Sequence, residues 1–219
     1  MLRFYLSSNG DANSLNGGGR LVAVAPGEER PDRFRYDPMN PVPTVGGGDC
    51  CNGGIVTPGA FDQRGVEARN DVLVYSSEPL KEPLEVSGFI ESVLNISSSA
   101  PDTDFAVKLV DVAPDGTAWI IGDTIFRARY RNGFDKPVMM KVGETYAIKP
   151  SPIATSVRFD TGHRIRIEVT SSNFPKFVRN LNTGGPNERE SHGQVADNVV
   201  HHAPGRHSYV DLPVVSAKR

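Results

Sequence analysis

Residues 162–185 read GHRIRIEVTSSNFPKFVRNLNTGG, and this stretch passes from a strand pattern into a polar loop. Ile165, Ile167 and Val169 alternate with charged residues, the period of two that is typical of a β-strand with one face on a core and the other in water. The loop that follows combines asparagines with two phenylalanines. Loops of this composition, held by a rigid strand, commonly carry binding residues. We therefore expect a half-buried strand that delivers a functional loop.

Strand patterns also dominate the rest of the chain. Eleven runs are rich in Val, Ile, Phe, Tyr or Thr: residues 2–6, 20–24, 32–36, 72–75, 84–96, 104–112, 117–130, 144–149, 153–159, 163–170 and 207–214. The dipeptide Asp115-Gly116 predicts a tight hairpin between two of these strands. A short helix is expected only within residues 186–198. The sequence therefore predicts an all-β fold, a two-sheet β-sandwich of jelly-roll type, as a single domain over residues 1–219.

One long excursion, residues 26–65, does not fit a minimal sandwich. Residues 26–43 contain five prolines and residues 46–59 contain six glycines, so this region can form few strand ladders. Loops of this length in compact domains are usually functional or disordered. We expect the excursion to form a covering flap.

Composition excludes several classes of partner. The net charge of -2 and a pI near 6.2 leave no basic field for a nucleic-acid backbone. No apolar run approaches the ~20 residues of a membrane-spanning helix, so no membrane partner is expected. Residues 2–6 resemble a strand rather than a signal peptide, which favours a cytoplasmic location for the chain present, any upstream targeting segment being absent from it.

Catalytic and redox motifs are missing from the sequence. No serine has a glycine two residues before it, which excludes the Gly-x-Ser-x-Gly elbow of the α/β-hydrolases. Cys50 and Cys51 are adjacent, so they cannot staple distant parts of the chain and are interpreted as loop thiols. We expect no nucleophile in this chain.

Metal-ligating patterns are weak as well. His201, His202 and His207 are the nearest approach to a cluster, but adjacent residues of a strand point to opposite faces. No metal site and no cofactor are expected. A Ca²⁺ site with oxygen ligands from Asp102, Asp104 or Asp111 remains as an alternative.

The segment 126–131, FRARYR, alternates arginine with other residues. On a strand its arginines would share one face, which suggests either an anion site or an exposed face paired with carboxylates such as Asp123 and Asp135. The second interpretation is the simpler one and is favoured.

A series of ordered motifs spans nearly the whole chain: DRFRYDP at 32–38, PVPT at 41–44, GG at 46–47, DQR at 62–64, DVLVY at 71–75, SSAPDTDF at 98–105, KLVDV at 108–112, PDG at 114–116, RARYR at 127–131, GHRI at 162–165 and the segment 171–185. Together they resemble the C-terminal domain of the CocE/NonD hydrolases, the family of cocaine esterases and X-Pro dipeptidyl-peptidases with glutaryl-acylase-like and α-amino-acid ester hydrolase relatives.

The resemblance implies a larger parent enzyme with an α/β-hydrolase core that bears a Ser-His-Asp triad, a helical cap and this galactose-binding-like jelly roll. The triad belongs to the core, so no catalytic residue is assigned here, and His163 beside Gly162 is given a turn role. In such a parent the jelly roll packs on the core and helps to wall the substrate pocket. The residues expected at that surface are Asp62, Gln63 and Arg64 from the first loop, and Asn173, Phe174, Arg179, Asn180 and Asn182 from the second.

Three functions are therefore compared. The favoured one is a noncatalytic accessory domain of an X-Pro dipeptidyl-peptidase or acylase-like serine hydrolase, whose partner is the α/β-hydrolase core. The alternative is a stand-alone carbohydrate- or ligand-binding module, for which Trp119 is the only tryptophan available. An independent enzyme that uses a metal or a cysteine has the least support. Separation from a core would expose a contact face, so a homo-oligomer is also expected.

Overall fold

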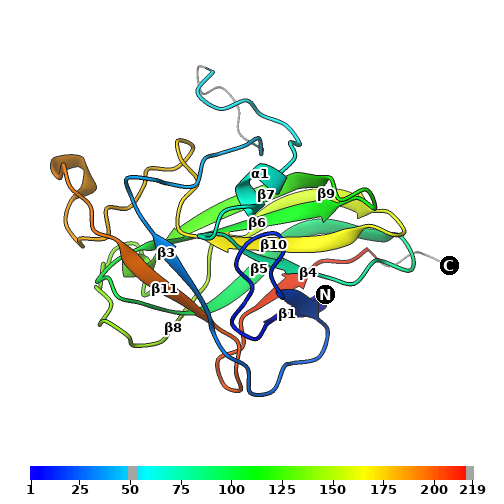
Figure 1. The fold of residues 1–219 in the computed structure, drawn as a ribbon, viewed down its shortest axis with the longest axis horizontal. Coiled ribbons are helices and arrows are strands. Elements are labelled where there is room, and N and C mark those ends of the chain that lie inside the picture. Colours follow the sequence, from blue (N-terminus) through cyan, green and yellow to red (C-terminus); the bar gives the residue numbers. More distant parts are fainter. Residues whose placement is uncertain (49–53, 216–219) are drawn as a thin grey trace.

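The computed structural model describes residues 1–48 and 54–215, and nearly all of its regular structure is β (Figure 1). The strands are β1 (Leu2–Ser7), β2 (Arg20–Val22), β3 (Asp32–Tyr36), β4 (Leu73–Ser76), β5 (Leu84–Ser98), β6 (Asp104–Val112), β7 (Ala118–Arg127), β8 (Tyr146–Ile148), β9 (Ile153–Phe159), β10 (Arg164–Thr170), β11 (Ala196–His201) and β12 (Tyr209–Leu212). The helical elements are α1 (Arg64–Glu67) and two single 3₁₀ turns, η1 (Ala128–Tyr130) and η2 (Asn187–Arg189). None of the helices described is long and apolar enough to cross a membrane.

The strands form an all-β sandwich joined through β5. The strand order is β3-β11-β5-β12-β1-β2-β4-β10-β6-β7, and β8 and β9 also pair with β5. Strand β5 is 15 residues long; its first half pairs with β9 and its second half with β8 and β11, while β12 pairs near its middle. The all-β sandwich prediction is confirmed, with all twelve described strands hydrogen-bonded into one continuous sheet. The jelly-roll type stays a prediction.

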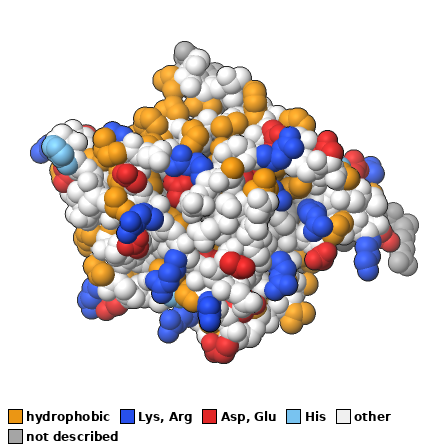
Figure 2. All heavy atoms as spheres, in the orientation of Figure 1, with side chains coloured by type: hydrophobic (Ala, Val, Ile, Leu, Met, Phe, Trp, Pro, Cys, Tyr) orange, Lys and Arg blue, Asp and Glu red, His pale blue; other side chains and the backbone are white. Residues whose placement is uncertain are grey.

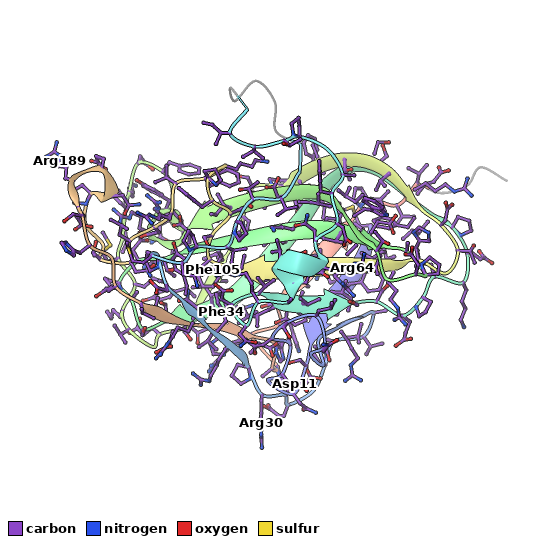
Figure 3. All side chains as sticks on the ribbon, turned by 45° about the horizontal axis from the view of Figure 1, so that its top comes forward. Asp11, Arg30, Phe34, Arg64, Phe105 and Arg189 are labelled. Atoms are coloured by element: carbon purple, nitrogen blue, oxygen red, sulfur yellow. The ribbon has the colours of Figure 1, made fainter. Side chains whose placement is uncertain are left out.

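The core lies between the two layers. Ile165, Ile167 and Val169 of β10 are fully buried in it, as their alternation predicts. Phe34 of β3 meets Phe105 of β6 edge to face, with ring centroids 6.4 Å apart, and both are labelled in Figure 3. These rings join the two layers of the sandwich.

The hairpin predicted at Asp115-Gly116 is also confirmed. Strands β6 and β7 pair antiparallel across it, and Gly116 has φ +86°, which favours glycine. Gly88 of β5 has φ +132° as well, and a Cβ there would lie 3.2 Å from Cγ of Pro213. The register between β5 and β9 continues without a shift through Gly88, so that ladder has no bulge there, and Gly88 instead allows a close approach of Pro213.

Three elements differ from the expectations. The short helix expected within residues 186–198 is present as the single 3₁₀ turn η2, and residues 196–201 form strand β11, because β3 and β5 pair with it on both sides. Its adjacent apolar residues Val199 and Val200 give no alternation from which a strand could be recognised. Strand β7 ends at Arg127 and turns into η1, and α1 forms at the end of the excursion, where no helix was expected.

The largest difference from the sequence-based prediction concerns the second face of β10. Its charged residues were expected in water, but Arg166 is 8% exposed and Glu168 is fully buried. Helix α1 lies over this face of the sheet in Figures 1 and 3 and brings Glu67 into contact with Arg166. The cover comes from a segment about a hundred residues away in sequence, so the local pattern contains no sign of it.

Candidate functional site

The first predicted segment, Asp62, Gln63 and Arg64, is fixed against the edge of β7. The backbone N–H of Gln63 donates to the carbonyl of Ala118 at 2.8 Å, and Ile120 donates to Phe61 at 3.2 Å. Asp62 forms an isolated bridge with Trp119. The end of the excursion therefore extends the sheet beyond β7 before it enters α1.

The three side chains of this segment have different roles. Gln63 is fully buried and donates from Nε2 to the carbonyls of Val45 (2.8 Å) and Phe61 (3.1 Å), so it holds the loop rather than lining a surface. Asp62 and the exposed Arg64 form an ion pair with a shortest N–O distance of 2.5 Å. Hydrogen bonds from Arg64 lower the pKa of Asp62 below its ordinary value. Only Asp62 and Arg64 are accessible from outside.

The second loop is bound to the first. The backbone of Phe174 donates to the carbonyl of Val42 at 3.0 Å and accepts from Thr44 at 2.7 Å. Asn173 is buried, and its Nδ2 donates to Oδ2 of Asp123 on β7 at 2.5 Å. The structure thus brings residues 42–45 and 173–176 together beside β7, and the common surface of the two loops stays a prediction.

Asn180 lies in a buried polar cluster beneath the second loop. Its Nδ2 donates to Asp102 and Asp104, at 2.8 Å in each case, and its carbonyl accepts from Tyr36 at 3.1 Å. Arg129 pairs with Asp102 at 2.8 Å and Arg127 pairs with Asp104 at 2.9 Å. Burial raises the pKa of Asp104 in spite of Arg127 and Asn180.

This cluster corrects two expectations. Arg127 and Arg129 do not lie on one face of a strand, and their partners are not Asp123 and Asp135. Strand β7 ends at Arg127, and the η1 turn directs Arg129 to Asp102. Asp102 and Asp104 are occupied by arginines and an amide, which argues against the Ca²⁺ alternative at these residues. Asp111 lies elsewhere and pairs with Nδ1 of His163 at 2.8 Å.

Asn182 and Arg179 complete the second loop. Asn182 is buried with φ +65°, and its Nδ2 donates to the carbonyl of Gln194 at 2.7 Å. Arg179 donates to the carbonyl of Pro38 at 3.0 Å and lies with its guanidinium 5.8 Å from the Phe174 ring centroid. Asn173, Asn180 and Asn182 therefore shape the loop from inside, whereas Phe174 and part of Arg179 face outward.

The outward side of these loops is apolar. Of its apolar side chains, Phe174 was predicted at this surface from the sequence. We name as the loop face the exposed apolar side chains on or beside the two loops: Ile55 (69% exposed), Phe61 (40%), Trp119 (41%), Phe174 (39%) and Val178 (68%). Figure 2 shows hydrophobic side chains gathered on the upper part of the molecule, where this part of the excursion rises from the sandwich. Phe61 and Trp119 could not be identified from sequence, because both lie in patterns that also suit a core.

Two connected grooves lie next to the second loop. The first, about 270 Å³, is lined by residues that include Arg127, Tyr130, Phe177 and Val178. The second, about 580 Å³, continues towards Tyr209 and Asp211. Phe126, Phe134 and Ser151 line both grooves. Aromatic, charged and small polar side chains all line them.

The histidines do not converge on a metal site. Nε2 of His201 lies 2.9 Å from Oγ of Ser97, His207 meets the carbonyl of Pro26, and the buried His202 lies between Glu29 and Asp32. Within residues 1–48 and 54–215 no three His, Cys, Asp or Glu side chains form a metal-binding group. Cys50 and Cys51 lie outside the described residues.

The contact between Ser97 and His201 does not have the environment of a catalytic pair. Burial, and after it the positive charges of Arg206 and Arg33, lower the pKa of His201. A triad imidazole is instead oriented by a carboxylate. Neither groove described above is lined by Ser97 or His201. His163 follows Gly162, which has φ +84°, and so combines the expected turn position with a 2.8 Å contact between its Nδ1 and Oδ1 of Asp111.

Fold and site together define a class of protein: a β-sandwich whose loop polar groups are held in internal ion pairs and hydrogen bonds, and which offers an apolar surface. The family model that matches residues 1–211 is the X-Pro dipeptidyl-peptidase C-terminal non-catalytic domain. The chain belongs to this family, the C-terminal domains of the CocE/NonD hydrolases, and the resemblance drawn from its motifs is confirmed.

Individual relatives agree with this assignment. The chain is 45% identical over 214 residues to the cocaine esterase of Rhodococcus sp. (strain MB1 Bresler), covering 97% of this chain and 37% of that protein. Among solved structures, an α-amino acid ester hydrolase superposes with a TM-score of 0.84 at 30% identity, covering 98% of this chain and 36% of the other. An aminopeptidase from a marine sediment archaeon, Thaumarchaeota archaeon, gives a TM-score of 0.81 at 27% identity with the same coverage, 98% and 36%. The chain thus spans little more than a third of each relative.

Proposed function

We propose that this chain is the accessory domain of a serine hydrolase of the dipeptidyl-peptidase, acylase or esterase type. In this proposal it packs on an α/β-hydrolase core of the same polypeptide, and the loop face helps to form the substrate pocket. The observation that carries the proposal is that the exposed apolar side chains Phe61, Trp119 and Phe174 stand on a framework fixed by β7.

Physical reasoning supports docking through this surface. Contiguous apolar side chains on a soluble domain mark interaction sites, and interfaces between domains of one chain cover about 600–1,500 Å². The loops below the surface are tied by Gln63, Asn173 and Asn180, so they present the apolar groups in one arrangement. A wall of a substrate pocket needs this rigidity because small displacements of a positioning surface reduce catalysis.

Substitution of Phe174 and Arg64 in the intact parent polypeptide tests the proposal. We expect Phe174→Ala to lower kcat/KM by about 5- to 30-fold, because truncation of an aromatic anchor at an interface costs about 1–2 kcal/mol. Phe89→Ala is the matched control, since Phe89 is 65% exposed on β5 and outside the loop face. Unchanged turnover and unchanged domain docking in both Phe174→Ala and Arg64→Ala would show that the loop face has no such role.

A homo-oligomer of the separated chain follows from the same reasoning. The loop face, uncovered, would be a sticky surface, and we expect concentration-dependent association in light scattering. A clean monomer at high concentration would remove this part of the proposal without affecting the docking of the core.

The groove of about 580 Å³ favours a second candidate function, a carbohydrate- or ligand-binding module. Its volume lies in the range of about 300–1,000 Å³ that small-molecule sites occupy. Phe126 and Phe134 supply aromatic side chains, and Arg3, whose guanidinium lies over the Tyr209 ring, forms an ion pair with Asp211. Titration of the chain with soluble saccharides, followed by NMR, tests this candidate; shifts confined to the groove and lost in Phe134→Ala would support it, and no shifts would exclude these ligands.

A further inference from the structure

Four charged side chains lie buried between α1 and the sheet. Lys108 comes from β6, Arg166 and Glu168 come from β10, and Glu67 comes from α1. Lys108, Glu67 and Glu168 are fully buried, and Arg166 is 8% exposed. Charges of this kind are stable inside a protein only when they are paired and hydrogen-bonded.

The donors in this cluster do not satisfy both carboxylates. Arg166 donates from Nη1 to Oε2 of Glu67 at 2.7 Å, but its Nε donates to Ser76 of β4. Lys108 donates to Oε1 of Gln63 at 3.2 Å and lies 3.4 Å from Oε2 of Glu168 without a hydrogen bond to it. Oε1 of Glu67 and both oxygens of Glu168 consequently have no hydrogen-bond donor.

A proton supplies the missing donor. A protonated carboxyl group can donate its O–H to a neighbouring carboxylate, and two buried carboxylates that repel each other titrate as one coupled pair. Burial, and then the charge and hydrogen bonding of Glu168, raise the pKa of Glu67 to about 7 against the attraction of Arg166. The other charged group that acts on Glu67 from its own helix is Arg64, which is exposed.

We propose that Glu67 and Glu168 hold one proton between them, and that this proton fastens helix α1 to the sheet. The inference concerns the chain itself and stands whether or not the loop face docks on a hydrolase core. Because Phe61 of the loop face is followed by Asp62 and Gln63, which lead directly into α1, the shared proton also affects how firmly Phe61 is held.

The direction of the pH effect follows from the two states of the helix. When α1 opens, the carboxyl group of Glu67 enters water and regains its ordinary acidity, so opening releases the proton. The opening equilibrium therefore rises with pH by up to about tenfold per unit between about pH 4.5 and 7, and is constant above that range. The docked helix is most firmly held under mildly acidic conditions.

An NMR titration of the native 219-residue chain tests the shared proton. We expect the side-chain ¹³Cδ signal of Glu67 to show a midpoint near pH 7, with a coincident change in the ¹³Cδ signal of the carboxyl group that shares its proton. Two independent midpoints near 4.5 would overturn the proposal. This measurement needs no variant, so it does not depend on how well a substituted cluster folds.

Amide hydrogen exchange tests the consequence for α1. The reporters are the N–H groups of Val66, Glu67 and Ala68, which donate to the carbonyls of Gln63 and Arg64. Their protection factors are expected to fall at least tenfold between pH 5 and 7 in the native chain and in the control Glu188→Gln, but to stay constant in Glu67→Gln, whose amide carries its own donor. Protection that is independent of pH in the native chain, or equally dependent on pH in Glu67→Gln, would refute the coupling.

Discussion

Substitution of Asp32 by asparagine should destabilise the protein by about 3–5 kcal/mol, because it removes the charge of a fully buried carboxylate that accepts several hydrogen bonds. Asp32 is fully buried and lies beside His202, which is fully buried too. It interacts with Oγ of Ser8 (2.5 Å), N of Ala12 (2.9 Å), the hydroxyl of Tyr75 (2.7 Å) and Nε2 of His202 (3.0 Å). Asparagine keeps the shape but replaces one acceptor oxygen by an NH₂ donor and removes the charge.

The magnitude follows from these contacts. Ser8 and the N–H of Ala12 share Oδ1, so the amide oxygen can stay there, and the new NH₂ group then faces Nε2 of His202 and the Tyr75 hydroxyl, which can rotate to accept. Hydrogen bonds to a charged acceptor contribute about 1.5–3 kcal/mol each, so the loss of charge at Asp32 weakens several interactions together. With a urea slope of about 2–3 kcal/mol per M, the midpoint of unfolding should fall by about 1–2 M.

Urea unfolding followed by circular dichroism and by the fluorescence of Trp119 measures this effect. Asp197→Asn is the control, because the Arg35–Asp197 pair is largely exposed, with side-chain exposures of 72% and 62%, and its loss should leave the midpoint unchanged. A loss of less than about 1 kcal/mol in Asp32→Asn would refute the view that the Asp32 network holds this end of the sandwich together.

The free energies of unfolding of the native chain and of Asp32→Asn, compared as a function of pH, give a second check. Burial alone would raise the pKa of Asp32, but hydrogen bonds from His202, Ser8, Ala12 and Tyr75 together lower it below its ordinary value. A carboxylate with a lowered pKa stabilises the fold above the pKa of the unfolded chain, near 4, and this contribution is lost as the pH falls through the folded value. The difference in free energy of unfolding between the native chain and Asp32→Asn should be constant from about pH 5 to 8 and should become smaller below about pH 4.

Two further substitutions test other parts of the fold. Gly88→Ala should cost more than about 1 kcal/mol, because Gly88 has φ +132° and the new Cβ would lie 3.2 Å from Pro213, whereas Gly27→Ala, with no atom within 4 Å, should be neutral by thermal unfolding. Asn180→Asp would place a third carboxylate against Asp102 and Asp104 and should cost more than about 3 kcal/mol in urea unfolding; an effect below about 1 kcal/mol would show that the cluster tolerates the extra charge.

Local sequence patterns predicted the fold where neighbours in sequence determine the structure. The alternation of Ile165, Ile167 and Val169 gave the core face of β10, and Asp115-Gly116 gave the β6–β7 hairpin, because side-chain period and turn conformation are local properties. Strand β11 was missed because its pairing with β3 and β5, rather than its own composition, makes it a strand.

The candidate site was predicted only in part, for the same physical reason. Segments 62–64 and 173–182 both contact β7, and their role in a common surface stays a prediction; the sequence did not distinguish their inward from their outward side chains. Asn180 and Gln63 are buried because distant partners, Asp102 and Val45 among them, satisfy their polar groups. The burial of Glu168 depends on α1, which arrives from the other half of the chain.

The position of β12 has a consequence for synthesis on the ribosome. Strand β12, Tyr209–Leu212, lies between β1 and β5 in the sheet order, so β1 is joined to the longest strand through residues that are translated long after both. At about 5–20 residues per second, the edge of β1 that pairs with β12 stays open for roughly 10–40 seconds, and the edge of β5 for about half as long, until β12 has been translated. The nascent chain is therefore exposed to mispairing and to chaperone capture until β12 emerges.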